Sequence, residues 1–207
     1  MKFITFEGCE ASGKSTQANF LKNYIKNSGH NVCLTREPGG SVLAEEIRTI
    51  LLKNKFVDPL TEYLLLAAAR RDHLLNLIIP KLKENFFVIS DRFYDSSLVY
   101  QGFCKNLDIN IIEKIRDITL EKCTPNLTFL LDIPAEEIKK RLKARSKILT
   151  HYDDMHLDFH KKIKEGFVKL ANMHKDRIVV IDATMKKKEI FELVKKIFHK
   201  RFGRFKK

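Results

Sequence analysis

The chain has 207 residues, 44% of them hydrophobic and 31% charged, and its formal net charge is +13. This length suits one domain with a single apolar core and leaves too little chain for a second independent core. The composition is that of a soluble globular protein, and the apolar runs are too short to cross a bilayer, which excludes an integral membrane protein.

Apolar runs and helical patterns alternate along the chain. Five short runs predict strands, at residues 3–6, 32–35, 86–90, 127–131 and 178–181. Helical patterns lie between and after them, at residues 14–27, 43–53, 61–83, 110–122, 135–145, 157–175 and 188–199. Because the strand runs are almost continuously hydrophobic, they predict strands that are covered on both faces. The sequence therefore predicts a three-layer α/β/α protein, with helices on both sides of a mostly parallel five-stranded sheet.

We expect residues 1–207 to form a single domain, with a core that spans about residues 3–197 and a basic tail at 198–207. The apolar run that begins at Phe3 is interrupted by Glu7, far short of the hydrophobic segment of an export signal. The four cysteines are scattered without a C-x-x-C pair, so neither a disulfide framework nor a metal cage is expected. These features predict a cytoplasmic protein with no membrane partner.

The net charge favours a polyanionic partner, either a nucleic acid or a phosphorylated small molecule. The chain has 39 Lys and Arg against 26 Asp and Glu, and much of the excess follows residue 160. Basic runs of this kind on helices typically form solvated faces. We therefore expect no specific nucleic-acid partner, and a nucleic-acid-binding NTPase is the alternative from a different functional class.

A glycine-bounded loop follows the first predicted strand and opens the first predicted helix. Its residues G-C-E-A-S-G-K-S match the phosphate-loop pattern G-x-x-x-x-G-K-[ST]. The glycines let consecutive backbone N–H groups point at phosphate oxygens, and the start of the helix adds its positive end. In this pattern Lys14 would reach the β- and γ-phosphates, and Ser15 would bind Mg²⁺. The residues expected to bind the donor nucleotide are Gly8, Cys9, Glu10, Ala11, Ser12, Gly13, Lys14, Ser15 and Thr16.

Further polar segments lie at the other strand ends, where parallel sheets bind their ligands. They are R-E-P-G-G at 36–40 after the second strand, D-R-F-Y-D-S-S at 91–97 and Y-Q-G at 100–102 after the third, and A-A-A-R-R-D-H at 67–73 within a predicted helix. Together with the phosphate loop, this ordered set resembles the thymidylate kinase family, the P-loop enzymes that phosphorylate dTMP. The resemblance runs from about Phe3 to about Ile197. It implies a P-loop kinase fold with a short LID segment, and transfer of the γ-phosphoryl group of ATP to dTMP with Mg²⁺ present, to give dTDP in dTTP biosynthesis.

The resemblance places charged residues at the phosphate groups. Asp91 stands at the end of an apolar strand, where its carboxylate would hold Mg²⁺ opposite Ser15. Arg92 corresponds to the family residue that grips the acceptor phosphate, a task suited to a planar fork that is always charged. Arg48 resembles a further contact to that phosphate, and the alternative for it is an ordinary surface arginine. Lys14 and Arg92 are thus expected to take part in catalysis.

The resemblance also implies contacts to the acceptor nucleoside. Arg70 and Gln101 would meet the polar edge of thymine, Tyr100 would lie close to the sugar and exclude a ribose 2′-hydroxyl, and Glu10 would face the 3′-hydroxyl. Leu66 stands where the family often has a phenylalanine that stacks on the base, so this chain gives up an aromatic contact there. The residues assigned to the acceptor are Glu10, Arg36, Glu37, Pro38, Arg48, Leu66, Arg70, Arg92, Ser96, Ser97, Tyr100 and Gln101.

A basic segment at 141–154 follows the fourth predicted strand and resembles the LID of the family. Some members of the family carry a basic residue inside the phosphate loop, whereas others place arginines in the LID. The corresponding loop position here is Ala11, so the chain resembles the second type. Arg141 and Arg145 are therefore the expected catalytic cations of the LID. The alternative is that these charges form a solvated helix face.

Three further expectations complete the sequence analysis. Asp182 and Ala183, after the last predicted strand, resemble the segment that borders adenine, with a simple strand-ending turn as the alternative. A homodimer is implied by the family alone. Within the P-loop kinases, the alternative is an enzyme that acts on another nucleoside monophosphate, against which the R-E-P-G-G and D-R-x-x-x-S segments weigh.

Overall fold

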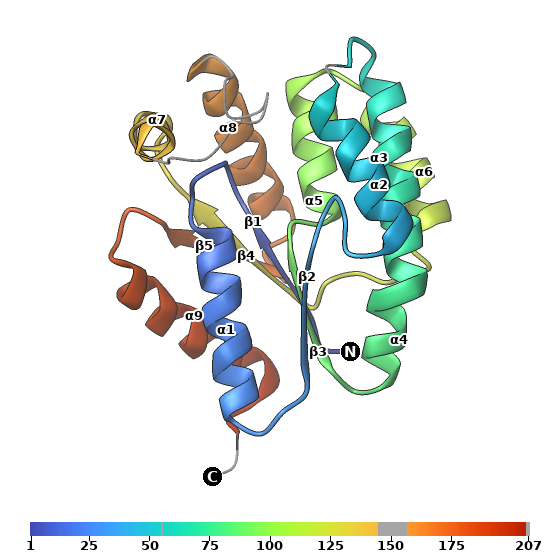
Figure 1. Ribbon diagram of the computed structural model, residues 1–207. Coiled ribbons are helices and arrows are strands. Elements are labelled where there is room, and N and C mark those ends of the chain that lie inside the picture. Colours follow the sequence, from blue (N-terminus) through green and yellow to red (C-terminus); the bar gives the residue numbers. More distant parts are fainter. Residues whose placement is uncertain (55, 145–156, 206–207) are drawn as a thin grey trace.

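The protein is a three-layer α/β/α structure built on one parallel sheet (Figure 1). This computed structural model describes residues 1–54, 56–144 and 157–205. The strands are β1 (Phe3–Glu7), β2 (Val32–Arg36), β3 (Phe87–Asp91), β4 (Leu127–Asp132) and β5 (Ile178–Asp182). They pair in parallel in the order β2-β3-β1-β4-β5. The predicted fold class, with its five-stranded parallel sheet, is confirmed.

Helices cover both faces of the sheet (Figure 1). They are α1 (Lys14–Asn27), α2 (Val42–Lys53), α3 (Pro59–His73), α4 (Ile79–Lys83), α5 (Tyr94–Ser97), α6 (Ile109–Thr119), α7 (Ala135–Lys143), α8 (Leu157–Met173) and α9 (Lys187–Phe202). Two π-helical segments, η1 (Leu74–Ile78) and η2 (Leu98–Cys104), continue α3 and α5. Helices α1 and α9 pack on one face, whereas η2 and α8 pack together on the other beside α3. Among the described residues, no helix is long and apolar enough to cross a membrane.

Two helical segments differ from the sequence expectation. The segment expected at 61–83 begins at Pro59, because the Asp58 carboxylate accepts hydrogen bonds from the first backbone N–H groups and proline fits the first helical turn. It then continues as α3, η1 and α4 rather than as one regular α-helix. The sequence analysis also expected no helix at 94–104, where α5 and η2 form. This second helical segment carries acceptor-side residues into the site.

The register of the sheet brings three strand ends to one edge. Phe6 of β1 pairs with Asp91 of β3, and Arg36 of β2 pairs with the same residue from the other side. The phosphate loop, which follows β1, therefore lies beside the segments that follow β2 and β3. Since β1 is the central strand, its loop sits in the middle of the edge where parallel sheets bind ligands.

The core is aromatic on the face of the sheet that α9 covers. Phe6 and Phe129 stack between neighbouring strands with ring centroids 5.0 Å apart, and both are fully buried. At the C-terminus, α9 continues to Phe202, past its expected end at residue 199. Phe198 is fully buried, and the Phe205 ring packs against His30 with centroids 4.1 Å apart. Aromatic residues of the basic tail are thus packed onto the fold, whereas Lys200, Arg201 and Arg204 are exposed.

Candidate active site

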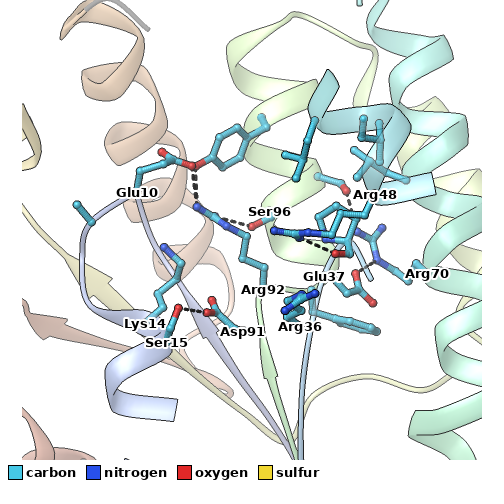
Figure 2. Close-up of a pocket in the computed structure, with 18 of the residues that line it drawn as sticks. Glu10, Lys14, Ser15, Arg36, Glu37, Arg48, Arg70, Asp91, Arg92 and Ser96 are labelled. Carbon is cyan, nitrogen blue, oxygen red and sulfur yellow. Dashed lines mark hydrogen bonds and ion pairs between the residues drawn. The ribbon is translucent and has the colours of Figure 1, made fainter. Parts of the chain in front are cut away.

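A pocket of about 800 Å³ opens at the carboxyl edge of the sheet, between the phosphate loop, α2, α3 and the α5–η2 segment. Figure 2 shows the side chains that line it. The sequence-predicted residues that line it are Glu10, Ala11, Gly13, Lys14, Ser15, Thr16, Arg36, Glu37, Pro38, Arg48, Leu66, Arg70, Asp91, Arg92, Ser96, Ser97, Tyr100 and Gln101. Gly8, Cys9 and Ser12 belong to the same loop without lining the pocket. Residues far apart in the sequence thus meet in one cavity.

The phosphate loop is closed on its own lysine. Lys14 Nζ donates to the carbonyl oxygens of Gly8 at 3.1 Å and Cys9 at 2.6 Å, and its contact with Ser12 Oγ is 3.4 Å. Burial, with a smaller contribution from Arg92, lowers the pKa of Lys14 to about 8. Gly8 has a φ of 133°, and a Cβ there would overlap the backbone of β4. Among the described residues, the hydrogen-bond partners of the buried Lys14 ammonium group are therefore all neutral oxygens.

Two oxygen ligands for a cation lie together beside the loop. Ser15 Oγ, at the start of α1, donates a hydrogen bond to Asp91 Oδ2 at the end of β3 (Figure 2). Hydroxyl and carboxylate oxygens are the hard ligands that Mg²⁺ takes, usually one or two from protein with phosphate oxygens and water completing the shell. These two side chains fit such an ion.

A charged cluster stands across the pocket from Lys14. Arg92 Nη2 donates to Glu10 Oε1 at 2.8 Å and to Tyr100 Oη at 3.1 Å, and Arg92 Nη1 donates to Ser96 Oγ at 3.0 Å (Figure 2). Burial alone would lower the pKa of Arg92, but the surrounding Tyr100, Glu10 and Glu7 outweigh it and raise that pKa. Arg92 is therefore held as a fixed positive charge in the pocket.

The Arg92 cluster rests on a carboxylate that the sequence analysis did not single out. Glu7, the last residue of β1, is 1% exposed. Its Oε1 accepts from the backbone N–H of Phe93 at 2.7 Å, and its Oε2 accepts from Ser96 Oγ at 2.6 Å. Burial, reinforced by the nearby Asp95 carboxylate, raises the pKa of Glu7 to about 7. The sequence did contain a signal for Glu7, because a charged residue directly follows the apolar run that forms β1.

A more deeply buried ion pair joins α3 to the segment that follows β2. Arg70 Nε donates to Glu37 Oε2 at 2.6 Å, and Arg70 Nη2 donates to Ser97 Oγ at 3.0 Å. Both partners of the ion pair are under 5% exposed in their side chains. Burial by itself would lower the pKa of Arg70, but Glu37 outweighs burial and raises it. Arg70 is thus locked in the pocket wall as a charged group.

Arg36 and Arg48 approach the pocket from the β2–α2 segment (Figure 2). Arg36 forms an exposed ion pair with Glu45, at 2.9 Å. Arg48 Nη1 donates to the Pro38 carbonyl at 2.7 Å, and burial, followed by the repulsion of Arg36, lowers its pKa. Arg48 is therefore a pocket residue rather than the isolated surface arginine that was the alternative.

One part of the pocket lining is apolar and lies near the amide of Gln101. Leu66 lines it together with Leu51, Leu52 and Phe93, which the sequence analysis had not assigned. Leu51 and Leu52 lie three and four residues after Arg48 on α2, so helical spacing alone would have placed them on the same face of the helix as Arg48. Among the described residues, the buried Gln101 Oε1 has no hydrogen-bond partner. Such an orphaned acceptor in an apolar wall suits a ligand that brings a donor.

The residues expected at the outer end of the donor site lie away from this pocket. Arg141 on α7 donates to the Ala183 carbonyl at 2.9 Å and, at 3.4 Å, to the carbonyl of Ala11 in the phosphate loop. The Asp182 carboxylate accepts a hydrogen bond from the backbone N–H of Thr184 at 2.8 Å, and Ala183 is fully buried. Arg145 and the rest of the expected LID to residue 154 lie outside the described residues.

The chain is similar to proteins of one family over nearly all of its length. The thymidylate kinase family model matches residues 6–194. A thymidylate kinase from Sulfurihydrogenibium sp. (strain YO3AOP1) is 44% identical, with 93% of this chain and 94% of the relative covered, and one from Geobacillus sp. (strain WCH70) is 43% identical, with 93% of each covered. The crystal structure of thymidylate kinase from Ehrlichia chaffeensis superimposes with a TM-score of 0.76 at 33% identity, over 94% of this chain and 97% of that one. The resemblance read from the motifs is confirmed, and this chain belongs to the thymidylate kinase family.

Proposed function

We propose that this protein transfers the γ-phosphoryl group of ATP to dTMP and releases dTDP and ADP. The observation that carries the proposal is the composition of one pocket, which is lined by the phosphate-loop Lys14 together with Arg92 and Arg70. A kinase needs a second set of cations to hold a phosphorylated acceptor, and arginines beside apolar side chains suit the phosphate and the base of such an acceptor. The names of the relatives supply the identity of that acceptor.

The donor phosphates bind at the loop between β1 and α1. Lys14 exchanges its loop carbonyl partners for β- and γ-phosphate oxygens, because a charged acceptor makes a stronger hydrogen bond than a neutral one. Ser15 and Asp91 would hold Mg²⁺ with the phosphates. When bound, this ion neutralises charge on the β- and γ-phosphates. Asp182 and Ala183 would border the adenine.

The acceptor phosphate binds between Arg92, Arg48 and Arg36. No general base is required, because the second pKa of a phosphate monoester is about 6 and the acceptor is mostly a dianion near neutral pH. Catalysis then comes from in-line positioning and from positive charge around the transferred group. Arg92 supplies a charge already fixed by Glu10 and Ser96. Arg141 and Arg145 would add the LID charges.

The acceptor nucleoside fills the remainder of the pocket. Arg70 and Gln101 read the polar edge of thymine, and the orphaned Gln101 Oε1 is free for the base N–H. Leu66 packs on the base in place of an aromatic ring. Tyr100, which donates a 2.6 Å hydrogen bond to Glu10, lies close to the sugar and excludes a 2′-hydroxyl, and Glu10 faces the 3′-hydroxyl. This arrangement favours a deoxynucleotide.

The quaternary state and the location follow from other features. We place a homodimer contact on α2, α3 and α6, where the large apolar side chains Val42, Ile50, Leu64 and Ile118 are between 46% and 83% exposed on neighbouring helices. Sedimentation velocity that gives the mass of a monomer at micromolar concentration would refute it.

We place the protein in the cytoplasm, since its four cysteines are unpaired.

The deciding experiment is a coupled assay of ADP release with ATP and Mg²⁺. The added component is dTMP, dUMP, dCMP, dGMP, shikimate or single-stranded DNA. Turnover driven by dTMP, with dUMP weaker or inert, supports the proposal. Equal turnover with another monophosphate would assign a different acceptor, and turnover driven by DNA alone would move the protein to the nucleic-acid-binding NTPases and make its basic surface the main clue.

A further inference from the structure

We propose that His73 is a positioning residue that orients Arg70 through Glu37 and thereby sets the affinity of the enzyme for the acceptor base. This inference rests on the proposed function, in which Arg70 reads the base. His73 is the last residue of α3 and is completely buried. It does not line the pocket, so any influence on the acceptor must pass through other side chains.

Both ring nitrogens of His73 have oxygen partners. Nδ1 lies 3.2 Å from Glu37 Oε1, and Nε2 lies 2.7 Å from Thr35 Oγ1. An imidazole that served only to fill the core would sit among apolar side chains, whereas this ring has a hydrogen-bond partner at each end. The two contacts together fix the plane and the direction of the ring.

The partners also fix the proton on the ring. The ionised Glu37 carboxylate can only accept, so Nδ1 carries the hydrogen that points to it. In the neutral imidazole Nε2 is then an acceptor, and the Thr35 hydroxyl donates to it. The hydrogen bonds therefore run in one direction, from Thr35 through His73 to Glu37.

Glu37 passes this constraint on to the base-reading arginine. While Oε1 is held by His73, Oε2 accepts from Arg70 Nε at 2.6 Å (Figure 2). Arg70 Nη2 is held in turn by Ser97 Oγ at 3.0 Å. Two of the three guanidinium nitrogens are thus occupied by the protein, and the orientation of Arg70 in the pocket wall depends on where Glu37 is held.

The R-E-P-G-G segment is shaped around His73 as well. Gly40 has a φ of 92°, a backbone conformation that favours glycine. A Cβ built on Gly40 would overlap both His73 Nε2 and Thr35 Oγ1. The last glycine of the segment therefore makes room for the hydrogen bond between these two side chains. The two hydrogen bonds of the ring and the space left by Gly40 therefore favour the same position of His73.

Removal of the imidazole would leave Glu37 Oε1 buried without its partner. The carboxylate would then turn or admit water, and Arg70 would lose its alignment with the base. Among the described residues, the side chains of Lys14, Ser15 and Asp91 form no hydrogen bond with the side chains of this chain of contacts. The Glu37 N–H does donate to the Asp91 carbonyl oxygen at 3.0 Å, but this backbone bond involves no part of the imidazole that is removed. The expected signature is therefore a weaker binding of dTMP with an unchanged binding of ATP.

The test is a double-mutant cycle of His73→Phe and Arg70→Met, followed by steady-state kinetics with dTMP and ATP. In the wild-type background, His73→Phe should raise KM for dTMP about tenfold, the effect of one lost buried hydrogen bond, and change KM for ATP less than about twofold. In the Arg70→Met background, the same substitution should change KM for dTMP less than about twofold, because its route to the base is gone. Effects that multiply in the double variant would overturn the inference.

The control is His199→Phe on α9. His199 also bridges two oxygens, Tyr24 Oη at 2.7 Å and the Gly203 carbonyl at 3.0 Å, but α9 packs on the opposite face of the sheet (Figure 1). It should leave KM for dTMP unchanged. A general loss of stability would instead affect both histidine variants, and thermal melts of each variant measure that contribution.

Two milder variants cover the case in which His73→Phe does not fold. Thr35→Val keeps the shape of the side chain and removes only the hydroxyl that orients His73, and it should raise KM for dTMP about threefold. His73→Gln keeps an N–H for Glu37 and should restore part of the affinity. If folded Thr35→Val and His73→Gln both bind dTMP like the wild type, the inference fails. If the wild-type protein itself shows no dTMP-dependent turnover, the proposed function fails instead.

Discussion

The two sides of the pocket hold their cations in different ways. On the proposed acceptor side, Arg70 pairs with Glu37 at 2.6 Å and Arg92 pairs with Glu10 at 2.8 Å. Each of these two arginines therefore has a carboxylate partner, whereas Arg48 donates to the Pro38 carbonyl oxygen. On the donor side, Lys14 and Arg141 reach backbone carbonyl oxygens, although Arg141 also has a longer contact of 3.3 Å to Glu137. Arg70 and Arg92 on the acceptor side are held by ion pairs, whereas the donor-side cations are held largely by neutral dipoles.

This difference indicates which side is ready before its ligand arrives. An arginine and a carboxylate attract as two full charges, whereas a carbonyl oxygen carries only a partial charge, so Arg70 and Arg92 are held in place more firmly than Lys14. Carbonyl partners yield readily to a phosphate, so Lys14 is able to change partners when ATP binds. The acceptor side gains affinity from its fixed arrangement, and the donor side keeps a cation available for charge that moves during the reaction.

The largest effect is expected on the donor side. Lys14→Met should lower kcat by about a thousandfold, or about 4 kcal/mol of transition-state stabilisation, because the transferred group loses a directly aimed cation. Its free energy of unfolding should not fall, since burial already disfavours the charged lysine, whose pKa is lowered to about 8. Single-turnover kinetics and urea unfolding measure the two quantities. A large loss of stability would show that Lys14 is held as firmly as the acceptor arginines.

The acceptor side should respond in the opposite manner. Arg70→Met leaves the Glu37 carboxylate buried without its arginine, and the free energy of unfolding should fall by about 3 kcal/mol. Urea unfolding against the wild type measures it, and Arg36→Met is the matched control because the Arg36–Glu45 pair is exposed and should contribute less than about 1 kcal/mol. Equal losses in the two variants would remove the distinction between the sides.

The sequence predicted the fold well because apolar runs report where strands are buried. Every expected strand was found, and each ends one residue past its apolar run, at Glu7, Arg36, Asp91, Asp132 and Asp182. Backbone pairing continues after the hydrophobic pattern stops, so a charged side chain closes each strand at the ligand-binding edge. The α5–η2 segment was not predicted, since its π-helical turns do not follow the spacing of an α-helix.

The site divides in the same way between local patterns and distant pairs. Lys14, Arg70 and Arg92 were found because they belong to short ordered segments. The carboxylates and hydroxyls that hold them were only partly found. Glu37 joins Arg70 across 33 residues and His73 across 36, and Glu7 joins Ser96 across 89. No local spacing encodes such pairs, because they arise only when the strands assemble.

Glu7 gives a test of how protonation supports the acceptor side. Its pKa is raised from 4.5 to about 7, so the folded protein binds this proton more tightly than the unfolded chain. The stabilisation is fully present below pH 4.5 and is lost as the pH rises through 7. The stability of the wild type relative to Glu7→Gln should therefore fall by about 2 to 3 kcal/mol between pH 4.5 and 8. Urea unfolding at several pH values over this range measures this difference in unfolding free energy, with the exposed Glu46→Gln as the control. A difference that does not change with pH would show that Glu7 does not take up a proton in the folded protein.

The smallest effect expected is a proton taken up with ATP. Because the pKa of Lys14 is about 8, about half of the free protein carries a neutral lysine at pH 8. Polyphosphate favours the charged form, so binding of a non-hydrolysable ATP analogue with Mg²⁺ should take up about half a proton at pH 8 and almost none at pH 6.5. Titration calorimetry in buffers of different ionisation enthalpy measures this uptake. Lys14→Arg should abolish it, because a guanidinium stays protonated at both values of pH. Proton uptake that persists in Lys14→Arg would show that another group takes up the proton. Lys14 would then be charged before ATP binds, just as the arginines of the acceptor side are charged before dTMP binds.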